Sequence, residues 1–142
     1  MTTFVLIPGM CHGGWCFHEL TEQLRSHGHR AYPLTLTGLS ERSHLLHGGV
    51  NLDTHIQDVT GVLAAEQLQD AVLVGHSYGG MVITGVADRM PERVRSLVYL
   101  DAVVPADGES IWTTHALDSG HNLMRDVPQD LLKILLETGE PT

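Results

Sequence analysis

The chain has 142 residues, of which 42% are hydrophobic and 18% are charged, and its formal net charge is −9 with only eight Lys and Arg. Its length and composition are typical of one soluble globular domain with a single hydrophobic core. The acidic balance disfavours nucleic acid and anionic membranes as partners, and it favours a small neutral molecule as the ligand.

The first predicted element is a buried strand from Thr3 to Ile7, a short apolar run that Pro8 and Gly9 bring to an end. Because this run is short and no basic region precedes it, we expect neither a signal peptide nor a membrane span, and we expect a cytoplasmic protein. The following loop, up to Gly14, is rich in glycine but has neither the G-x-G-x-x-G order nor the Gly-Lys-Ser/Thr ending of nucleotide-binding loops. No nucleotide cofactor is therefore expected.

Trp15 begins the first predicted helix, which ends near Gly28, a residue suited to a left-handed helix cap. A second strand from Ala31 to Leu36 contains Pro33, and a proline inside a strand indicates the edge of a sheet. The next loop, residues 37–49, is long for a compact domain, so we expect it to border a functional site.

The cysteine and histidine pattern predicts no metal site. Cys11 and Cys16 are too few to form a disulfide framework, and reduced thiols are expected. His44 and His47 lie in the long loop, where no carboxylate or cysteine completes a metal-binding set, so we expect them to be exposed to solvent.

A helix capped by Asn51 or Asp53 comes next and runs to Gln67. Its inward face is expected to carry four apolar side chains: Ile56, Val59, Val62 and Leu63. Asp53, His55 and Asp58 cluster at its start, which in a crossover helix lies on the flank of the sheet. We therefore predict capping and surface roles for these three residues.

A Gly-x-Ser-x-Gly sequence centred on Ser77 joins four consecutive apolar residues, 71–74, to a segment with helical apolar spacing, 81–90. This pattern predicts a serine raised on a sharp strand-to-helix turn with a strained backbone. Glycines at positions 75 and 79 remove side chains that would strike the neighbouring strand or helix. The amide of Tyr78, at the positive end of the helix dipole, would then stabilise an oxyanion formed when Ser77 attacks a carbonyl group.

The fourth predicted strand covers Val94 to Leu100, after a stop at Pro91. Four strands alternating with three helices predict an α/β fold with a doubly wound parallel sheet, in which ligands bind at the carboxyl ends of the strands. Gly9, Ser77 and Asp101 all fall at these ends. Beyond residue 105 the pattern changes to a loose segment and then a short apolar helix, residues 128–137.

Three segments together resemble the α/β-hydrolase superfamily: LIPGMCHGGW at 6–15, VGHSYGG at 74–80 and VYLDAVVP at 98–105. The branch that they resemble contains plant methylesterases, hydroxynitrile lyases and bacterial pyrethroid-type carboxylesterases. The resemblance implies that residues 1–105 are the N-terminal part of a hydrolase core, that 106–142 begin a helical cap, and that the rest of the core is absent. A complete domain of this kind is expected to have about 230 to 280 residues.

The resemblance implies cofactor-independent hydrolysis of a small carboxylic ester, with Ser77 as the nucleophile and the Met10 and Tyr78 amides as the oxyanion hole. It further implies three residues around the substrate pocket: Gly9, Cys11 and Asp101. Hydroxynitrile lyases carry a hydroxyl residue at the position of Gly9 and an acid at that of His76, so both positions favour an esterase. A small-molecule binding protein on the same scaffold and an enzyme resembling the hydroxynitrile lyases are the two open alternatives.

A serine nucleophile needs a histidine to accept its proton and an acid to orient that histidine. Asp101 is a possible orienting acid, whereas His115 and His121 lie where no strand end would hold them near Ser77. We therefore expect the 142 residues alone to be inactive. The strand from Val94 to Leu100 would also have one unpaired edge, which predicts self-association or coverage by the C-terminal helix.

Overall fold

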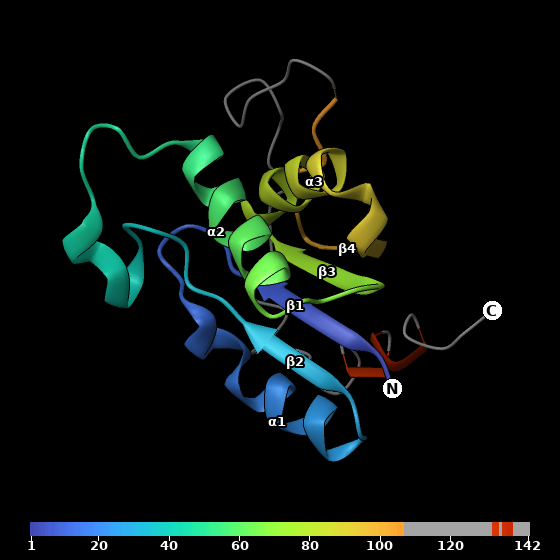
Figure 1. Ribbon diagram of the computed structural model, residues 1–142. Helices are drawn as coiled ribbons and strands as arrows, with labels where there is room; N and C mark the ends of the chain where they lie inside the picture. Colours follow the sequence, from blue (N-terminus) through green and yellow to red (C-terminus); the bar gives the residue numbers. More distant parts are fainter. Residues whose placement is uncertain (107–131, 134, 138–142) are drawn as a thin grey trace.

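The computed structural model describes residues 1–106, 132, 133 and 135–137, which contain a four-stranded sheet in the order β2-β1-β3-β4 (Figure 1). All three strand pairs are parallel. The strands are β1 (Thr3–Ile7), β2 (Arg30–Pro33), β3 (Ala71–His76) and β4 (Val94–Leu100). The predicted α/β class with a parallel sheet is confirmed.

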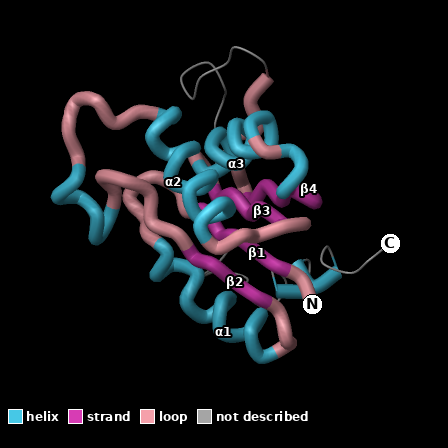
Figure 2. The backbone as a smooth tube through the Cα atoms, in the orientation of Figure 1, coloured by secondary structure: helices cyan, strands magenta, loops and turns pink. Residues whose placement is uncertain are grey.

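Helices cover both faces of the sheet, with α1 on one face and α2 and α3 on the other (Figures 1 and 2). The α-helices are α1 (His18–Ser26), α2 (Leu52–Ala65) and α3 (Gly79–Arg89), and 3-10 turns cover Gly14–Phe17, Ser40–Leu45 and Pro91–Arg93. The chain winds outward from β1 to β2 and then, in the opposite direction, to β3 and β4. The winding therefore reverses between β1 and β3, and such a reversal point is where open α/β sheets bind ligands.

Alternate residues of β1 enter two different cores. Phe4 and Leu6 pack in a cluster with residues of α1, whereas Val5 and Ile7 pack in a second cluster with residues of α2 and α3. Successive side chains of a strand point to opposite faces, so a strand covered on both sides must be apolar throughout. This requirement explains the continuous apolar run at the start of the chain.

β2 lies at an edge of the sheet as predicted, but it is shorter than the predicted strand and ends at Pro33. Leu34 donates its N–H to the Leu6 carbonyl at 3.0 Å, next to the last register pair of the two strands. The carbonyl of Thr35 instead accepts a hydrogen bond from Arg42 at 2.8 Å. The chain therefore leaves the sheet before Leu36, where the Arg42 side chain of the following loop satisfies the Thr35 carbonyl.

Asn51, rather than Asp53, caps α2. The Thr54 N–H donates to Asn51 Oδ1 and the Asn51 N–H donates to Thr54 Oγ1, both at 3.1 Å, and together they form a capping box. Asp53 lies in the first turn and pairs with Arg89 of α3. The alternative between the two predicted caps is thus resolved by a reciprocal pair of hydrogen bonds.

Residues 132, 133 and 135–137 are helical, and Leu132 and Leu135 are buried in the same cluster as Phe4 and Leu6. This segment therefore covers the α1 side of the sheet. The rest of the helix predicted over residues 128–137 lies outside the described residues. Among the described strands, β4 pairs with β3 alone. No helix of the described residues combines the length and apolar character that a bilayer span requires.

Candidate active site

Ser77 lies at the junction of β3 and α3 with a backbone φ of +55°, in a region that L-residues rarely adopt. Its N–H donates to the Leu100 carbonyl at 3.3 Å, and its own carbonyl accepts from Gly80 at 3.0 Å and from Val103 at 3.1 Å. A strained residue of this kind costs about 1 to 3 kcal/mol and persists only where its surroundings fix it. The three hydrogen bonds supply that constraint on the predicted strand-to-helix turn.

The two glycines around Ser77 lie where a side chain has no space. A Cβ atom on Gly75 would come within 2.6 Å of the Gly79 carbonyl oxygen, and one on Gly79 within 2.6 Å of the Ile7 carbonyl oxygen. Both obstacles are backbone atoms, which cannot rotate away. The Gly-x-Ser-x-Gly spacing therefore follows from the close approach of α3 to β1 and β3.

The loop after β1 lies directly against the serine. A Cβ atom on Gly9 would be 2.8 Å from Ser77 Cβ. The loop then turns, with the His12 N–H donating to the Gly9 carbonyl at 3.3 Å and with Cys11 at a φ of +63°. Met10 is 50% exposed and Cys11 is exposed. Three predicted site residues therefore lie in one turn beside Ser77, at the reversal point of the sheet.

His12 is a residue of this loop that the sequence interpretation did not single out. Its Nδ1 donates to the Met10 carbonyl at 3.0 Å, and its ring stacks on Trp15 at a centroid distance of 5.7 Å. The same ring meets His76 edge to face at 6.0 Å. These contacts hold the loop in the turn described above.

Asp101 follows β4 directly and has a φ of +43°. The residue before it, Leu100, accepts the hydrogen bond from Ser77, so Asp101 lies beside the serine turn. His115 and His121, the two histidines considered in the sequence as bases, lie outside the described residues.

The side chain of Tyr78 is only 6% exposed and points toward α2, where its O–H donates to His55 Nδ1 at 2.8 Å. His55 is also 6% exposed, and its Nε2 donates to the Thr37 carbonyl at 2.8 Å. A carbonyl oxygen only accepts, so Nε2 carries the proton of the neutral ring and Nδ1 is the acceptor. The two rings pack edge to face at 5.5 Å.

The prediction of surface roles for His55 and Asp58 is wrong. His55 lies three residues after Leu52 and four before Val59, a spacing that places it on the inward face of α2. Asp58 accepts hydrogen bonds from the Thr37 N–H and hydroxyl, both at 2.7 Å. The apolar spacing of α2 was the sequence signal that His55 is buried, and the cluster of polar residues at the start of the helix obscured it.

Raising the pH is expected to destabilise the fold through Tyr78. Burial, with a smaller contribution from the Asp58 carboxylate, raises the pKa of Tyr78 from its ordinary 10.0 to about 12. The folded state therefore holds the phenol proton more tightly than the unfolded state. This contribution is complete below pH 10 and is lost as the pH rises toward 12, and it amounts to about 2 to 3 kcal/mol.

Urea unfolding at pH 9 and pH 11.5 measures this effect. We expect wild type to lose about 2 kcal/mol more than Tyr78→Phe between the two pH values. An equal loss in both proteins would show that Tyr78 does not carry the pH dependence.

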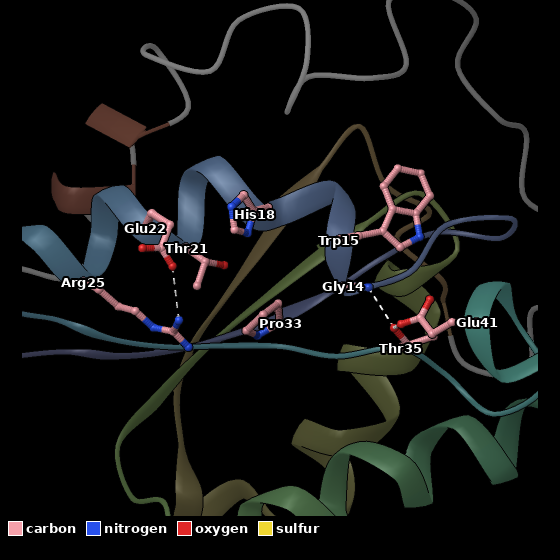
Figure 3. A pocket seen from close by; sticks show the side chains of 9 residues that line it. All are labelled: Gly14, Trp15, His18, Thr21, Glu22, Arg25, Pro33, Thr35 and Glu41. Carbon is pink, nitrogen blue, oxygen red and sulfur yellow. Dashed lines mark hydrogen bonds and ion pairs between the residues drawn. The ribbon is translucent and has the colours of Figure 1, made fainter.

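A cavity with a volume of about 290 Å³ lies between α1 and the β2 edge of the sheet (Figure 3). In Figure 3 Gly14 faces Thr35, and the Gly14 N–H donates to Thr35 Oγ1 at 2.8 Å. The lining residues are Gly14, Trp15, His18, Thr21, Glu22, Arg25, Pro33, Thr35 and Glu41, which include none of the predicted site residues. The position of the candidate site is therefore inferred from the backbone geometry around Ser77 and not from this cavity.

Over the described ranges, no group of three or more His, Cys, Asp or Glu side chains could hold a metal ion. Cys11 and Cys16 are free thiols. Burial raises the pKa of the Cys16 thiol to about 12, so this thiol is protonated at neutral pH and is a poor nucleophile.

The chain matches a family of known proteins, individual relatives and solved structures. Residues 4–138 match the Alpha/beta hydrolase family. The chain is 44% identical to the carbendazim hydrolyzing esterase of Nocardioides sp. (strain SG-4G), over 96% of this chain and 64% of that protein. It is 28% identical to esterase PIR7B of Oryza sativa subsp. japonica, over 91% of this chain and 47% of that protein.

Among solved structures, an extracellular alpha/beta-hydrolase from a Paenibacillus species superposes with a TM-score of 0.71 at 28% identity. The superposition covers 96% of this chain and 50% of that one. The chain thus spans between about half and two thirds of the length of these relatives.

Proposed function

The chain belongs to the alpha/beta hydrolase family, and from this membership we propose that it hydrolyses a small carboxylic ester through an acyl-enzyme on Ser77. One observation carries the proposal. Ser77 stands at a φ of +55° between a buried strand and a helix, and the loop after β1 lies against it. This arrangement supports an exposed nucleophile with amide donors on two sides.

In the proposed reaction the Ser77 oxygen attacks the ester carbonyl, and the carbonyl oxygen becomes an oxyanion. The amides of Met10 and Tyr78 stabilise it, since Tyr78 precedes the first residue of α3 and lies at the positive end of that helix. Gly9 leaves room for the tetrahedral carbon. The C–O bond to the alcohol then breaks, the alcohol departs with a proton, and water hydrolyses the acyl-enzyme to the acid.

Ser77 requires a base to accept its proton. We propose that this histidine lies outside the described residues, and that the acid which orients it is either Asp101 or a residue outside them as well. The 142 residues on their own are then expected to be inactive, so activity is to be measured on the protein in its full natural length.

The substrate is proposed to be a small neutral ester. The acidic composition of the chain and the name of the 44% identical relative both support this class. Carbendazim, which the name of that relative gives as its substrate, and p-nitrophenyl acetate, a simple carboxylic ester, are suitable first substrates. Turnover of either one distinguishes an enzyme from a binding protein, which would saturate without releasing product.

Labelling with a fluorophosphonate tests the nucleophile. The serine oxygen displaces fluoride from phosphorus, and the adduct remains on the residue that attacked. We expect one phosphonyl group per chain, recovered by peptide mass spectrometry on Ser77. Ser26→Ala is the matched control, because Ser26 is an exposed serine at the end of α1 whose hydroxyl bonds to the Gln23 carbonyl. Modification at another residue, with Ser77 unlabelled, would refute the proposal.

A further inference from the structure

A series of hydrogen bonds, joined in the middle by the covalent backbone of residues 35–42, runs from Tyr78, next to the serine, to the loop after β1 on the other side of the site. In its first part Tyr78 donates to His55 in a buried hydrogen bond, and His55 donates to the Thr37 carbonyl in a half-buried one, each at 2.8 Å. The Thr37 N–H and hydroxyl both donate to Asp58, at 2.7 Å each. Helix α2 thus holds Thr37 through the side chains of His55 and Asp58.

The second part passes through residues 35–42, which we call the bridging segment. The Gly14 N–H donates to the Thr35 hydroxyl at 2.8 Å, and that hydroxyl donates to the Glu41 carboxylate (Figure 3). Trp15 Nε1 donates to the Ser40 hydroxyl at 2.7 Å. The bridging segment therefore contacts the loop after β1 at two consecutive residues.

Strand pairing alone does not fix the position of the Tyr78 turn relative to the loop after β1. Met10 and Tyr78 lie in turns that follow different strands, β1 and β3, at the point where the winding reverses. Strand pairing ends at the Ile7–Gly75 register pair, before either turn begins. Alignment of the two proposed amide donors therefore depends on contacts beyond the sheet.

His55 is the residue on which the series depends. Its ring is the hydrogen-bond partner of both the buried Tyr78 hydroxyl and the Thr37 carbonyl. We propose that His55 is a positioning residue, which holds the Tyr78 turn in register with the bridging segment and, through it, with the loop that contains Met10. This inference rests on the proposed ester hydrolysis. An interaction that aligns oxyanion donors acts in the transition state, so its loss should lower kcat and leave KM nearly unchanged.

Three replacements of His55 separate its two hydrogen bonds. His55→Phe keeps a planar ring and removes both bonds. His55→Asn retains an acceptor near the position of Nδ1, toward Tyr78, and His55→Gln retains a donor near the position of Nε2, toward Thr37. In the full-length protein we expect His55→Phe to lower kcat by about 10- to 100-fold, less than the loss of an oxyanion donor itself. His55→Asn should recover most of that loss, and His55→Gln less.

The control is His29→Phe. His29 also has a ring nitrogen bonded to backbone, accepting from the Thr2 N–H at 3.1 Å, and also packs edge to face on an aromatic ring, that of Phe4. It lies before β2, at the opposite end of the sheet from Ser77. This variant should lose stability, by urea unfolding, without a change in kcat.

The outcomes are distinct. A folded His55→Phe with kcat within twofold of wild type overturns the inference, as does an equal fall in kcat for His29→Phe. A fall in kcat that His55→Asn does not recover overturns it as well.

Nitrogen-15 NMR of the 142-residue chain gives a check that needs no activity. Tyr78→Phe should shift the His55 Nδ1 resonance and leave Nε2 protonated, and an unshifted Nδ1 resonance refutes the contact. If wild type shows no Ser77-dependent turnover, the proposed function fails and the inference fails with it, even where the NMR result stands.

Discussion

Ser77→Ala is expected to lower the kcat for p-nitrophenyl acetate by about 10⁴- to 10⁶-fold in the full-length protein. The alanine variant keeps the backbone and the amide donors but has no oxygen that can form the acyl-enzyme. Residual activity would come from oxyanion stabilisation of a water attack. Initial rates at saturating ester measure the effect, with Ser26→Ala as the control that should retain wild-type activity. Ser77→Ala with more than a tenth of wild-type activity would exclude Ser77 as the nucleophile.

Ser77→Gly gives a second measurement at the same position. It should be as inactive as Ser77→Ala, because both lack the hydroxyl group. Glycine, however, adopts a φ of +55° without the steric cost that alanine bears there. Ser77→Gly is therefore expected to unfold at a higher urea concentration than Ser77→Ala, and the opposite order would mean that the turn is not strained.

Gly79→Ala is expected to destabilise the fold by about 3 kcal/mol. The added Cβ would lie 2.6 Å from the Ile7 carbonyl oxygen and 3.2 Å from that of Pro8, and both atoms belong to the backbone beneath α3. The first turn of α3 would have to move away from β1, and Ser77 would move with it. Urea unfolding at neutral pH measures the loss.

Gly61→Ala is the matched control, since Gly61 is inside α2 and its added Cβ would meet no atom within 4 Å. Alanine is the better helix former by about 1 kcal/mol, so this variant should be slightly more stable than wild type. If Gly79→Ala is as stable as Gly61→Ala, the close packing of α3 on β1 is not as described here.

The sequence alone predicted the parallel sheet and the serine turn because both depend on local signals. Four apolar residues before Gly75 indicate a buried strand, and the glycine spacing around Ser77 reports a close backbone approach that only glycine permits. The edge position of β2 followed from Pro33, which donates no hydrogen bond.

Other features of the structure could not be predicted from the sequence because they depend on partners that are distant along the chain. β2 ends early since the Arg42 side chain bonds to the backbone carbonyl of Thr35. The burial of His55 depends on Tyr78, 23 residues later. The apolar spacing of α2 could have indicated that His55 is buried, but its hydrogen-bonding role requires knowledge of its partner, because a polar residue near the start of a helix is most often exposed.

The hydrogen bonds of Ser77 to Leu100 and Val103 set a condition on biosynthesis. A ribosome releases the glycine-flanked turn well before it releases β4, and until then the serine backbone lacks two of the bonds that fix it. The reactive geometry is thus completed by a strand that emerges later. We expect a nascent chain that ends before residue 94 to have β1 and β3 paired while its serine turn is still free to relax.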